Sequence, residues 1–130
     1  MDTPKILEFG FSKMNNGVSI SFFELHEMIP FEVKRVYTIS TSAIESTRGN
    51  HAHVNQNQVI ICVEGCATAK IISKSGEVLN FDVTKQALFI PKNQWIEINM
   101  YPHSTLLCFA SENYDNLISI FEKNKFLNQD

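Results

Sequence analysis

Two histidines, His51 and His53, are the residues of this sequence best suited to chemistry. Side chains two residues apart on a β-strand point to the same face, so we expect the two imidazoles to project together. An imidazole has an ordinary pKa of about 6.5 and is a natural general base near neutral pH. Inside a barrel, such a pair suits proton abstraction next to a carbonyl, followed by reprotonation one carbon away.

A second segment places a phenol and a guanidinium side by side. Side chains alternate along Val33–Ile39, and residues 33, 35, 37 and 39 share one face of the predicted strand. Arg35 and Tyr37 are therefore neighbours. The phenol of Tyr37, next to two histidines, is a candidate for relaying protons between adjacent atoms of a substrate.

The elements that position these residues are mostly strands. Short apolar segments recur about every 8–12 residues with turn residues between them, which is typical of a β sandwich or barrel. The predicted strands are Val18–Leu25, Val33–Ser40, Gln58–Glu64, Thr68–Ser73, Val78–Val83, Gln86–Ile90, Trp95–Met100 and Thr105–Ala110. Only the tail Asn113–Leu127 carries a partial apolar stripe with helical spacing. The sequence predicts one all-β domain over residues 1–130 with a small C-terminal helix.

Composition excludes several classes of function. The chain has 130 residues, 44% of them hydrophobic, and a net charge of −3. This balance argues against binding nucleic acid through a basic surface. No segment resembles a membrane span or a signal peptide, so we expect a cytoplasmic protein without a membrane partner. Cys62, Cys66 and Cys108 form no C-x-x-C pair, and we expect buried thiols.

The spacing around the histidines resembles the first motif of the cupins, which are small jelly-roll barrels. The motif is G-x-H-x-H followed by an acidic residue and a glycine, and the matching positions are Gly49, His51, His53, Gln58 and Gly65. Cupins often bind a metal through the histidines, the acidic residue and a later histidine. Here Gln58 and Ile96 occupy the last two places, and two imidazoles fall short of a typical catalytic zinc site. We expect no metal, since Glu97 would help only if its strand turned it inward.

Nearly the whole chain, about residues 17–127, resembles the sugar 3,4-ketoisomerases of the cupin superfamily, the WxcM-like, FdtA/QdtA-type enzymes. The segments that carry the resemblance are Ile29–Tyr37 (I-P-F-E-V-K-R-V-Y), Arg48–His53 (R-G-N-H-A-H), Gln58, Ile90-Pro91, Trp95, Ala110–Asp115 and Phe126-Leu127. The first two blocks are fairly specific. The resemblance therefore implies a cupin barrel and a nucleotide-sugar substrate.

The implied reaction moves the keto group of dTDP-4-keto-6-deoxyglucose from C4 to C3 without metal or cofactor, in a homodimer. Its product leads toward amino-deoxysugars of surface polysaccharides. The resemblance assigns the base at C3 to His51, with His53 and Tyr37 assisting proton transfer through an enediol. Binding is expected from three polar side chains and one aromatic ring: Arg35, Arg48, Gln58 and Trp95.

The two arginines, Arg35 and Arg48, are candidates for the pyrophosphate or the sugar because a guanidinium binds phosphate oxygens in a bidentate manner. Trp95 has two interpretations, a surface for the nucleotide base or packing in the barrel wall. Ile96 stands where many family members have histidine or arginine. The early strand of the family usually carries a polar or aromatic residue that faces the sugar, and Val18–Ser21 (V-S-I-S) offers little for that role. The gluco or galacto configuration of the product therefore stays open. Two other functions also stay open, a metal-dependent small-molecule cupin enzyme and a non-catalytic nucleotide-sugar-binding cupin.

Overall fold

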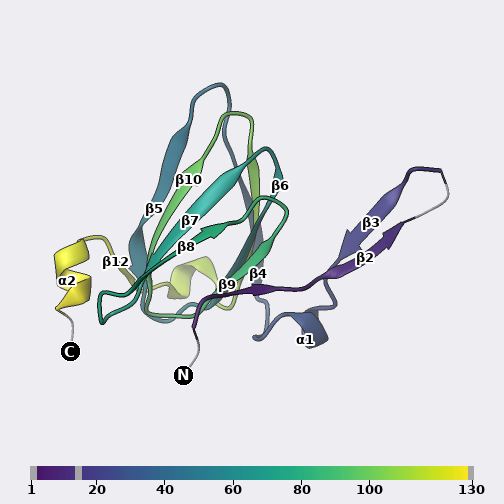
Figure 1. Ribbon diagram of the computed structural model, residues 1–130. Coiled ribbons are helices and arrows are strands. Elements are labelled where there is room, and N and C mark those ends of the chain that lie inside the picture. Colours follow the sequence, from purple (N-terminus) through teal and green to yellow (C-terminus); the bar gives the residue numbers. More distant parts are fainter. Residues whose placement is uncertain (1–2, 14–15, 129–130) are drawn as a thin grey trace.

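Two antiparallel sheets and a projecting hairpin make up the computed structural model, which describes residues 3–13 and 16–128 (Figure 1). The first sheet has the order β1 (Lys5–Leu7), β9 (Ala87–Ile90), β6 (Gln58–Glu64), β11 (Thr105–Ala110), β4 (Arg35–Ser40). The second has the order β12 (Ser119–Ile120), β5 (Ser46–His53), β10 (Trp95–Met100), β7 (Ala67–Ile72), β8 (Val78–Asp82). The hairpin pairs β2 (Gly10–Lys13) with β3 (Ser19–Phe22). The short helices are α1 (Leu25–Met28), the 3-10 helix η1 (Tyr114–Asn116) and α2 (Lys123–Leu127).

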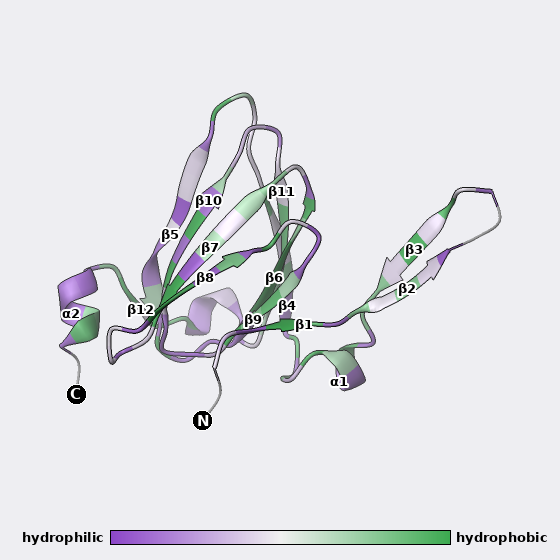
Figure 2. Cartoon of the chain, in the orientation of Figure 1, coloured by the Kyte–Doolittle hydropathy of each residue, from purple (hydrophilic) through white to green (hydrophobic). Residues whose placement is uncertain are grey.

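The two sheets share one apolar core. Ile60 and Leu106 of the first sheet pack in the same cluster as Ile71 and Ile98 of the second, and all four side chains are buried. Alternation along each strand produces this arrangement, because every second residue turns toward the facing sheet. Apolar residues accordingly recur along the facing strands (Figure 2).

The predicted fold class is confirmed. Three predicted strands, Gln58–Glu64, Trp95–Met100 and Thr105–Ala110, have the bounds of β6, β10 and β11. The structure is almost entirely β with a short helix at its C-terminal end, as in a cupin-like jelly roll. The short strands β1, β2 and β12 and the helix α1 were not predicted.

The prediction of one helix over Asn113–Leu127 is wrong in its extent. This tail forms η1, then β12, and only then the five-residue helix α2. Ser119 and Ile120 of β12 pair with His53 and Ala52 of β5. Backbone hydrogen bonding to the sheet edge therefore replaces helical hydrogen bonding in the middle of the tail, and tertiary contact overrides the apolar spacing.

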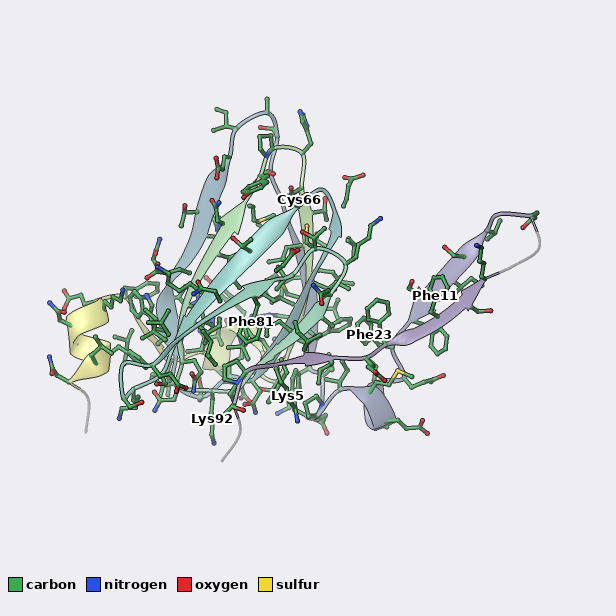
Figure 3. The ribbon with its side chains drawn as sticks, in the orientation of Figure 1. Lys5, Phe11, Phe23, Cys66, Phe81 and Lys92 are labelled. Carbon is green, nitrogen blue, oxygen red and sulfur yellow. The ribbon has the colours of Figure 1, made fainter. Side chains whose placement is uncertain are left out.

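The hairpin β2–β3 projects away from the sheets as an arm (Figure 1). At its base, the ring of Phe23 packs 5.4 Å from that of Phe9 and 5.2 Å from that of Phe109, measured between centroids. Beyond this anchor, Phe11 and Ile20 are 62% and 43% exposed, and Phe11 stands clear of the barrel (Figure 3). The arm thus presents apolar side chains to solvent.

Two remaining expectations concern cysteines and membranes. Cys62 and Cys108 are buried thiols, but Cys66 is exposed, so the expectation of burial is wrong for it (Figure 3). Cys66 follows the turn at Gly65 and precedes β7, outside the alternating part of the strand. Within residues 3–13 and 16–128, no helix has the length and apolar composition needed to cross a membrane.

Candidate active site

A cavity of about 600 Å³ lies between the two sheets. Six of the seven predicted site residues line it, and they come from three strands: Arg35 and Tyr37 on β4, Arg48, His51 and His53 on β5, and Gln58 on β6. A volume of this size is within the range of small-molecule sites. The structure therefore brings together residues that are up to 23 positions apart in sequence, taken from Arg35 to Gln58.

Strand register explains why the polar side chains of the first sheet lie level with one another. Ala110 on β11 pairs with Arg35 on one side and with Gln58 on the other. Along β4, Arg35, Tyr37 and Ile39 all turn toward the cavity, as the alternation of Val33–Ile39 predicts. The guanidinium, the phenol and the amide are thus placed on one wall by backbone pairing.

A β-bulge in β5 places Arg48 and His51 on the same face. Opposite β10, His51 pairs with Ile96 and Arg48 pairs with Ile98, so β5 has one residue more than its partner between these pairs. Residues three apart on a regular strand point to opposite faces. The extra residue in the bulge shifts the alternation by one, so Arg48 and His51 point to the same face. Gly49 in the bulge has φ +87°, a conformation that favours glycine.

Substitution of Gly49 by alanine is expected to cost more stability than the same change at another glycine with equal φ. A Cβ at Gly49 would lie 2.7 Å from the carbonyl oxygen of Ile96, whereas one at Gly76, also at φ +87°, meets nothing within 4 Å. Gly76→Ala should cost about 1–2 kcal/mol for the backbone strain alone, and Gly49→Ala about 1–2 kcal/mol more.

Urea unfolding of the two glycine variants measures this difference in the free energy of unfolding. Because the bulge keeps Arg48 and His51 on the same face of β5, Gly49→Ala should also lower activity while Gly76→Ala should not. Equal losses of stability in the two variants would show that the backbone relieves the contact between the new Cβ and the carbonyl oxygen of Ile96 without losing unfolding free energy.

The imidazoles of His51 and His53 are in direct contact. Their Nε2 atoms lie 2.8 Å apart, and the ring planes are inclined by 63°. A hydrogen bond between two nitrogens needs one donor and one acceptor, so the pair cannot carry a proton on both Nε2 atoms. On its other side, Nδ1 of His53 lies 3.0 Å from Oγ of Ser119.

The electrostatic surroundings keep His53 neutral. Burial, followed by the neighbouring His51 and the guanidinium of Arg35, lowers the pKa of His53 to about 4. At neutral pH His53 therefore carries one proton and has one nitrogen free to accept a hydrogen bond. The free nitrogen of His53 can therefore accept a proton that His51 gives up.

The low pKa of His53 should make the fold less stable in acid. Between the unfolded pKa of about 6.5 and the folded value of about 4, the unfolded chain binds more protons, so stability falls as the pH falls. We expect this group to remove about 2 kcal/mol of unfolding free energy across the window. The variant His53→Asn should flatten that part of the profile in urea unfolding at pH 7, 6, 5 and 4. An unchanged slope would mean that His53 titrates normally in the folded protein.

Tyr37 is placed to hold a proton. Burial, followed by the proximity of Cys108, raises the pKa of Tyr37 well above its ordinary value, although Arg35 acts in the opposite direction. Its hydroxyl donates a long hydrogen bond of 3.5 Å to Oε1 of Gln58. The phenol is therefore protonated at neutral pH and can donate to an oxygen that enters the cavity.

Arg35 is a half-buried cation with few partners. Its Nη2 donates to Oε1 of Gln56 at 3.4 Å, and its guanidinium carbon lies 4.9 Å from the centroid of the Tyr37 ring. Nη1 is buried without a hydrogen-bond partner, and no carboxylate among the described residues forms an ion pair with Arg35. Such a group is suited to an anion that binds in the cavity.

Trp95 does not line the cavity, which corrects its expected role in holding the nucleotide base within this chain. It is 3% exposed in a separate apolar cluster with Phe126, and its Nε1 donates to Glu97 at 2.9 Å. Alternation along β10 turns Trp95 and Glu97 to the outer face, where Lys123 reaches Glu97 at 3.4 Å. Ile96 is therefore the residue of this trio that lines the cavity.

Sequence reasoning missed several residues of the site. Cys108 lines the cavity beside Tyr37, with which it pairs across β11 and β4, and burial raises its pKa to about 12. The alternation of Leu106 and Cys108 in the predicted strand was a signal for this position. Gln56 and Ser119 had no comparable signal, because both meet the site through contacts that are distant in sequence.

The donor set in the cavity is poor for a metal. The described part of the chain contains no group of three or more histidine, cysteine or acidic side chains close enough to hold an ion. The guanidinium of Arg35, near enough to His53 to lower its pKa, adds a positive charge beside the two imidazoles. Glu97, the one candidate for a third ligand, is on the outer face with Trp95 and Lys123.

Comparison with known proteins places this geometry in a family. A jelly-roll barrel with a histidine pair in its interior defines a cupin-type protein. The family model described as "WxcM-like, C-terminal" matches residues 2–130. The chain therefore belongs to the WxcM-like family, and its predicted membership is confirmed.

The relatives of this chain are sugar 3,4-ketoisomerases. It is 29% identical over 112 residues to TDP-4-oxo-6-deoxy-alpha-D-glucose-3,4-oxoisomerase of Aneurinibacillus thermoaerophilus, covering 83% of this chain and 79% of the relative. The WlaRB TDP-quinovose 3,4-ketoisomerase of Campylobacter jejuni matches with a TM-score of 0.86 and 32% identity over 98% of both chains. The sugar 3,4-ketoisomerase QdtA of Thermoanaerobacterium thermosaccharolyticum, in complex with TDP, matches with a TM-score of 0.82 and 26% identity, over 95% of this chain and 91% of QdtA. The expectation of an enzyme of this type is confirmed.

Proposed function

We propose that this protein moves the keto group of a TDP-linked 4-keto-6-deoxyhexose from C4 to C3 by proton transfer through an enediol, without a metal. The observation that carries the proposal is the pair of imidazoles in contact at 2.8 Å, with one ring held neutral, inside a cavity that a small molecule can enter. The relatives named above act on or bind TDP and TDP-sugars, which supports this substrate class.

Each proton in the reaction has a place in the cavity. His51 removes the proton from C3 while the carbonyl oxygen at C4 takes the phenolic proton of Tyr37, and the result is an enediol. The hydroxyl at C3 then returns its proton to the oxygen of Tyr37, and C4 receives a proton from the imidazole pair. The sugar ends as a 3-ketone, and the side chains return to their initial protonation states.

The two arginines supply the charge that a nucleoside diphosphate needs. Arg35 has a buried Nη1 without a partner, and Arg48 is exposed on the cavity wall. Guanidinium groups bind phosphate oxygens through paired N–H donors. We infer that Arg35 meets the diphosphate or the sugar inside the cavity and that Arg48 helps to attract the anion at its edge.

Incubation with TDP-4-keto-6-deoxyglucose in deuterated water tests the reaction. We expect a 3-keto product, identified by NMR, with solvent deuterium at C4. Substrate that binds with unchanged structure over hours would favour a non-catalytic sugar-binding protein. Stoichiometric iron, manganese or zinc in the purified protein, together with loss of turnover on chelation, would contradict the metal-free reaction and favour a metal-dependent cupin enzyme.

We also propose that the protein is a homodimer and that its arm, residues 10–22, forms part of the interface. The arm leaves Phe11, Val18, Ile20 and Phe22 between 40% and 62% exposed while making no sheet contact with its own barrel. Exposed apolar side chains gathered on one projecting element are typical of a surface that a second chain covers.

Replacement of Phe11 and Ile20 by serine should convert a dimer into a monomer. Light scattering after size exclusion should give twice the 14.8 kDa chain mass for the wild type and a single chain mass for the variant. Ile44→Ser is the matched control, because Ile44 is 76% exposed and lies in the loop before β5. A wild type that is monomeric at micromolar concentration would overturn this proposal.

A further inference from the structure

Gln56 is a buried amide next to the polar wall of the cavity. It is 1% exposed, it lies in the connection between β5 and β6, and it does not line the cavity itself. Its Oε1 accepts a hydrogen bond of 3.4 Å from Nη2 of Arg35, and its Nε2 donates one of 3.5 Å to Oε1 of Gln58. Gln56 therefore contacts two residues of the cavity wall without being part of that wall.

The residues on both sides of Gln56 are anchored. Nδ2 of Asn55 donates to the backbone oxygen of Asn116 at 2.7 Å. The backbone N–H of Asn57 donates to Oγ of Ser111 at 2.9 Å. A buried side chain between two anchored residues has lost most of its conformational freedom on folding. The amide is therefore a fixed group against which another side chain can be oriented.

The partner that Gln56 offers to Arg35 is neutral. None of the described residues that line the cavity is acidic, and Nη1 of Arg35 is buried without a hydrogen-bond partner. A carboxylate in place of the amide would pair with the guanidinium and cancel its charge. An amide oxygen instead accepts one N–H and leaves the positive charge and Nη1 for another acceptor.

We propose that Gln56 is a positioning residue: it orients the guanidinium of Arg35 toward the diphosphate of a nucleotide, and its neutrality keeps that cation free for the anion. This inference rests on the proposed function and deepens it. With Nη2 held by Gln56, Nη1 remains free to donate to a phosphate oxygen. Orientation before binding reduces the entropy that binding costs.

A double-mutant cycle in the binding of TDP tests the orienting contact. Isothermal titration compares the wild type, Gln56→Met, Arg35→Met and the double variant. Methionine is close to glutamine in size but accepts no hydrogen bond from the guanidinium as an amide does. We expect Gln56→Met to raise the dissociation constant about fivefold in the wild type and less than about twofold in the Arg35→Met background, where no guanidinium is left to orient. Equal factors in the two backgrounds would overturn the proposal.

The kinetic constants separate orientation from damage to the fold. Gln56→Met should raise KM for TDP-4-keto-6-deoxyglucose while kcat stays within about threefold of the wild-type value, because the imidazole pair is unchanged. A loss that falls mainly on kcat would assign Gln56 to the support of the catalytic groups and would contradict its action through Arg35.

The variant Gln56→Glu tests the importance of a neutral partner. A carboxylate of nearly the same shape should pair with Arg35 and compete with the diphosphate. We expect the affinity for TDP to fall about 50-fold, as far as in Arg35→Met, and to become less sensitive to salt. Gln86→Glu is the matched control, because it makes the same change of charge at an exposed residue outside the cavity wall. A loss no larger than that of Gln56→Met would contradict the role of neutrality.

The failure of the proposed function would be recognised separately. TDP binding does not require turnover, so the cycle holds even if the sugar is not isomerised. If the wild type does not bind TDP, the proposed substrate class fails, and urea unfolding judges the contact. Gln56→Glu should then cost less unfolding free energy in the wild type than in the Arg35→Met background, where the buried carboxylate has no cation beside it. Equal losses in both backgrounds would contradict the pairing of residue 56 with Arg35.

Discussion

Replacement of His51 by asparagine is expected to lower kcat about 10³-fold while the dissociation constant for the TDP-sugar stays within about threefold of the wild-type value. The imidazole of His51 is the ring that both borders the cavity and has a free nitrogen, whereas His53 is only 9% exposed. Asparagine is similar in size and polar, but it cannot accept the C3 proton. Binding depends instead on the arginines and the cavity wall, which this change leaves in place.

Turnover assays measure kcat for His51→Asn, and titration with the TDP-sugar measures its dissociation constant separately. His26→Asn is the matched control, because His26 is exposed on α1 and far from the cavity wall in the fold. A variant at His51 with normal kcat would assign the base to His53 or to another group. A large loss of affinity would instead show that His51 contributes to substrate binding rather than to proton transfer.

The histidine pair could be predicted from the sequence because it depends on one strand. His51 and His53 are two residues apart, and period-two alternation alone puts them on one face. Arg35 and Tyr37 were placed by the same rule, and the cavity contains all four. These predictions needed only local geometry.

The position of Arg48 in the cavity wall depends on strand pairing as well as on alternation along its own strand. Strict alternation would turn it away from His51, and only the bulge at Gly49 brings it back. A glycine beside the histidines signals that such a bulge is available, but its position depends on how β5 pairs with β10. Register between distant strands cannot be derived from one strand's pattern.

The sequence left two interpretations of Trp95 open for a related reason, and the structure shows packing in the barrel wall. The bounds of β10 were predicted, and alternation separates Trp95 from Ile96. Which of the two faces meets the cavity is decided by α2, whose Phe126 covers Trp95 at 6.1 Å between ring centroids. The same tail provides Ser119 through β12, so an incorrect helix prediction concealed two features of the site at once.

Replacement of Arg35 by methionine is expected to raise the dissociation constant for the TDP-sugar about 50-fold, which is the loss of one or two charge-assisted hydrogen bonds. The guanidinium has a buried Nη1 without a partner, so its hydrogen-bonding capacity is unused until an anion enters. Methionine retains much of the apolar stem and its contact with the ring of Tyr37. Isothermal titration at two salt concentrations measures the affinity, and the variant should lose less affinity at high salt than the wild type does.

The same change should leave the fold as stable as before or more stable, because it removes a half-buried charge that no carboxylate compensates among the residues described. It should also raise the pKa of His53, since Arg35 is one of the groups that lower it. Arg48→Met is the matched control, and its effect on affinity should be smaller because Arg48 is exposed and screened by solvent. An Arg35→Met variant that binds normally but unfolds more easily would make Arg35 a structural residue of the barrel wall, with the diphosphate held elsewhere.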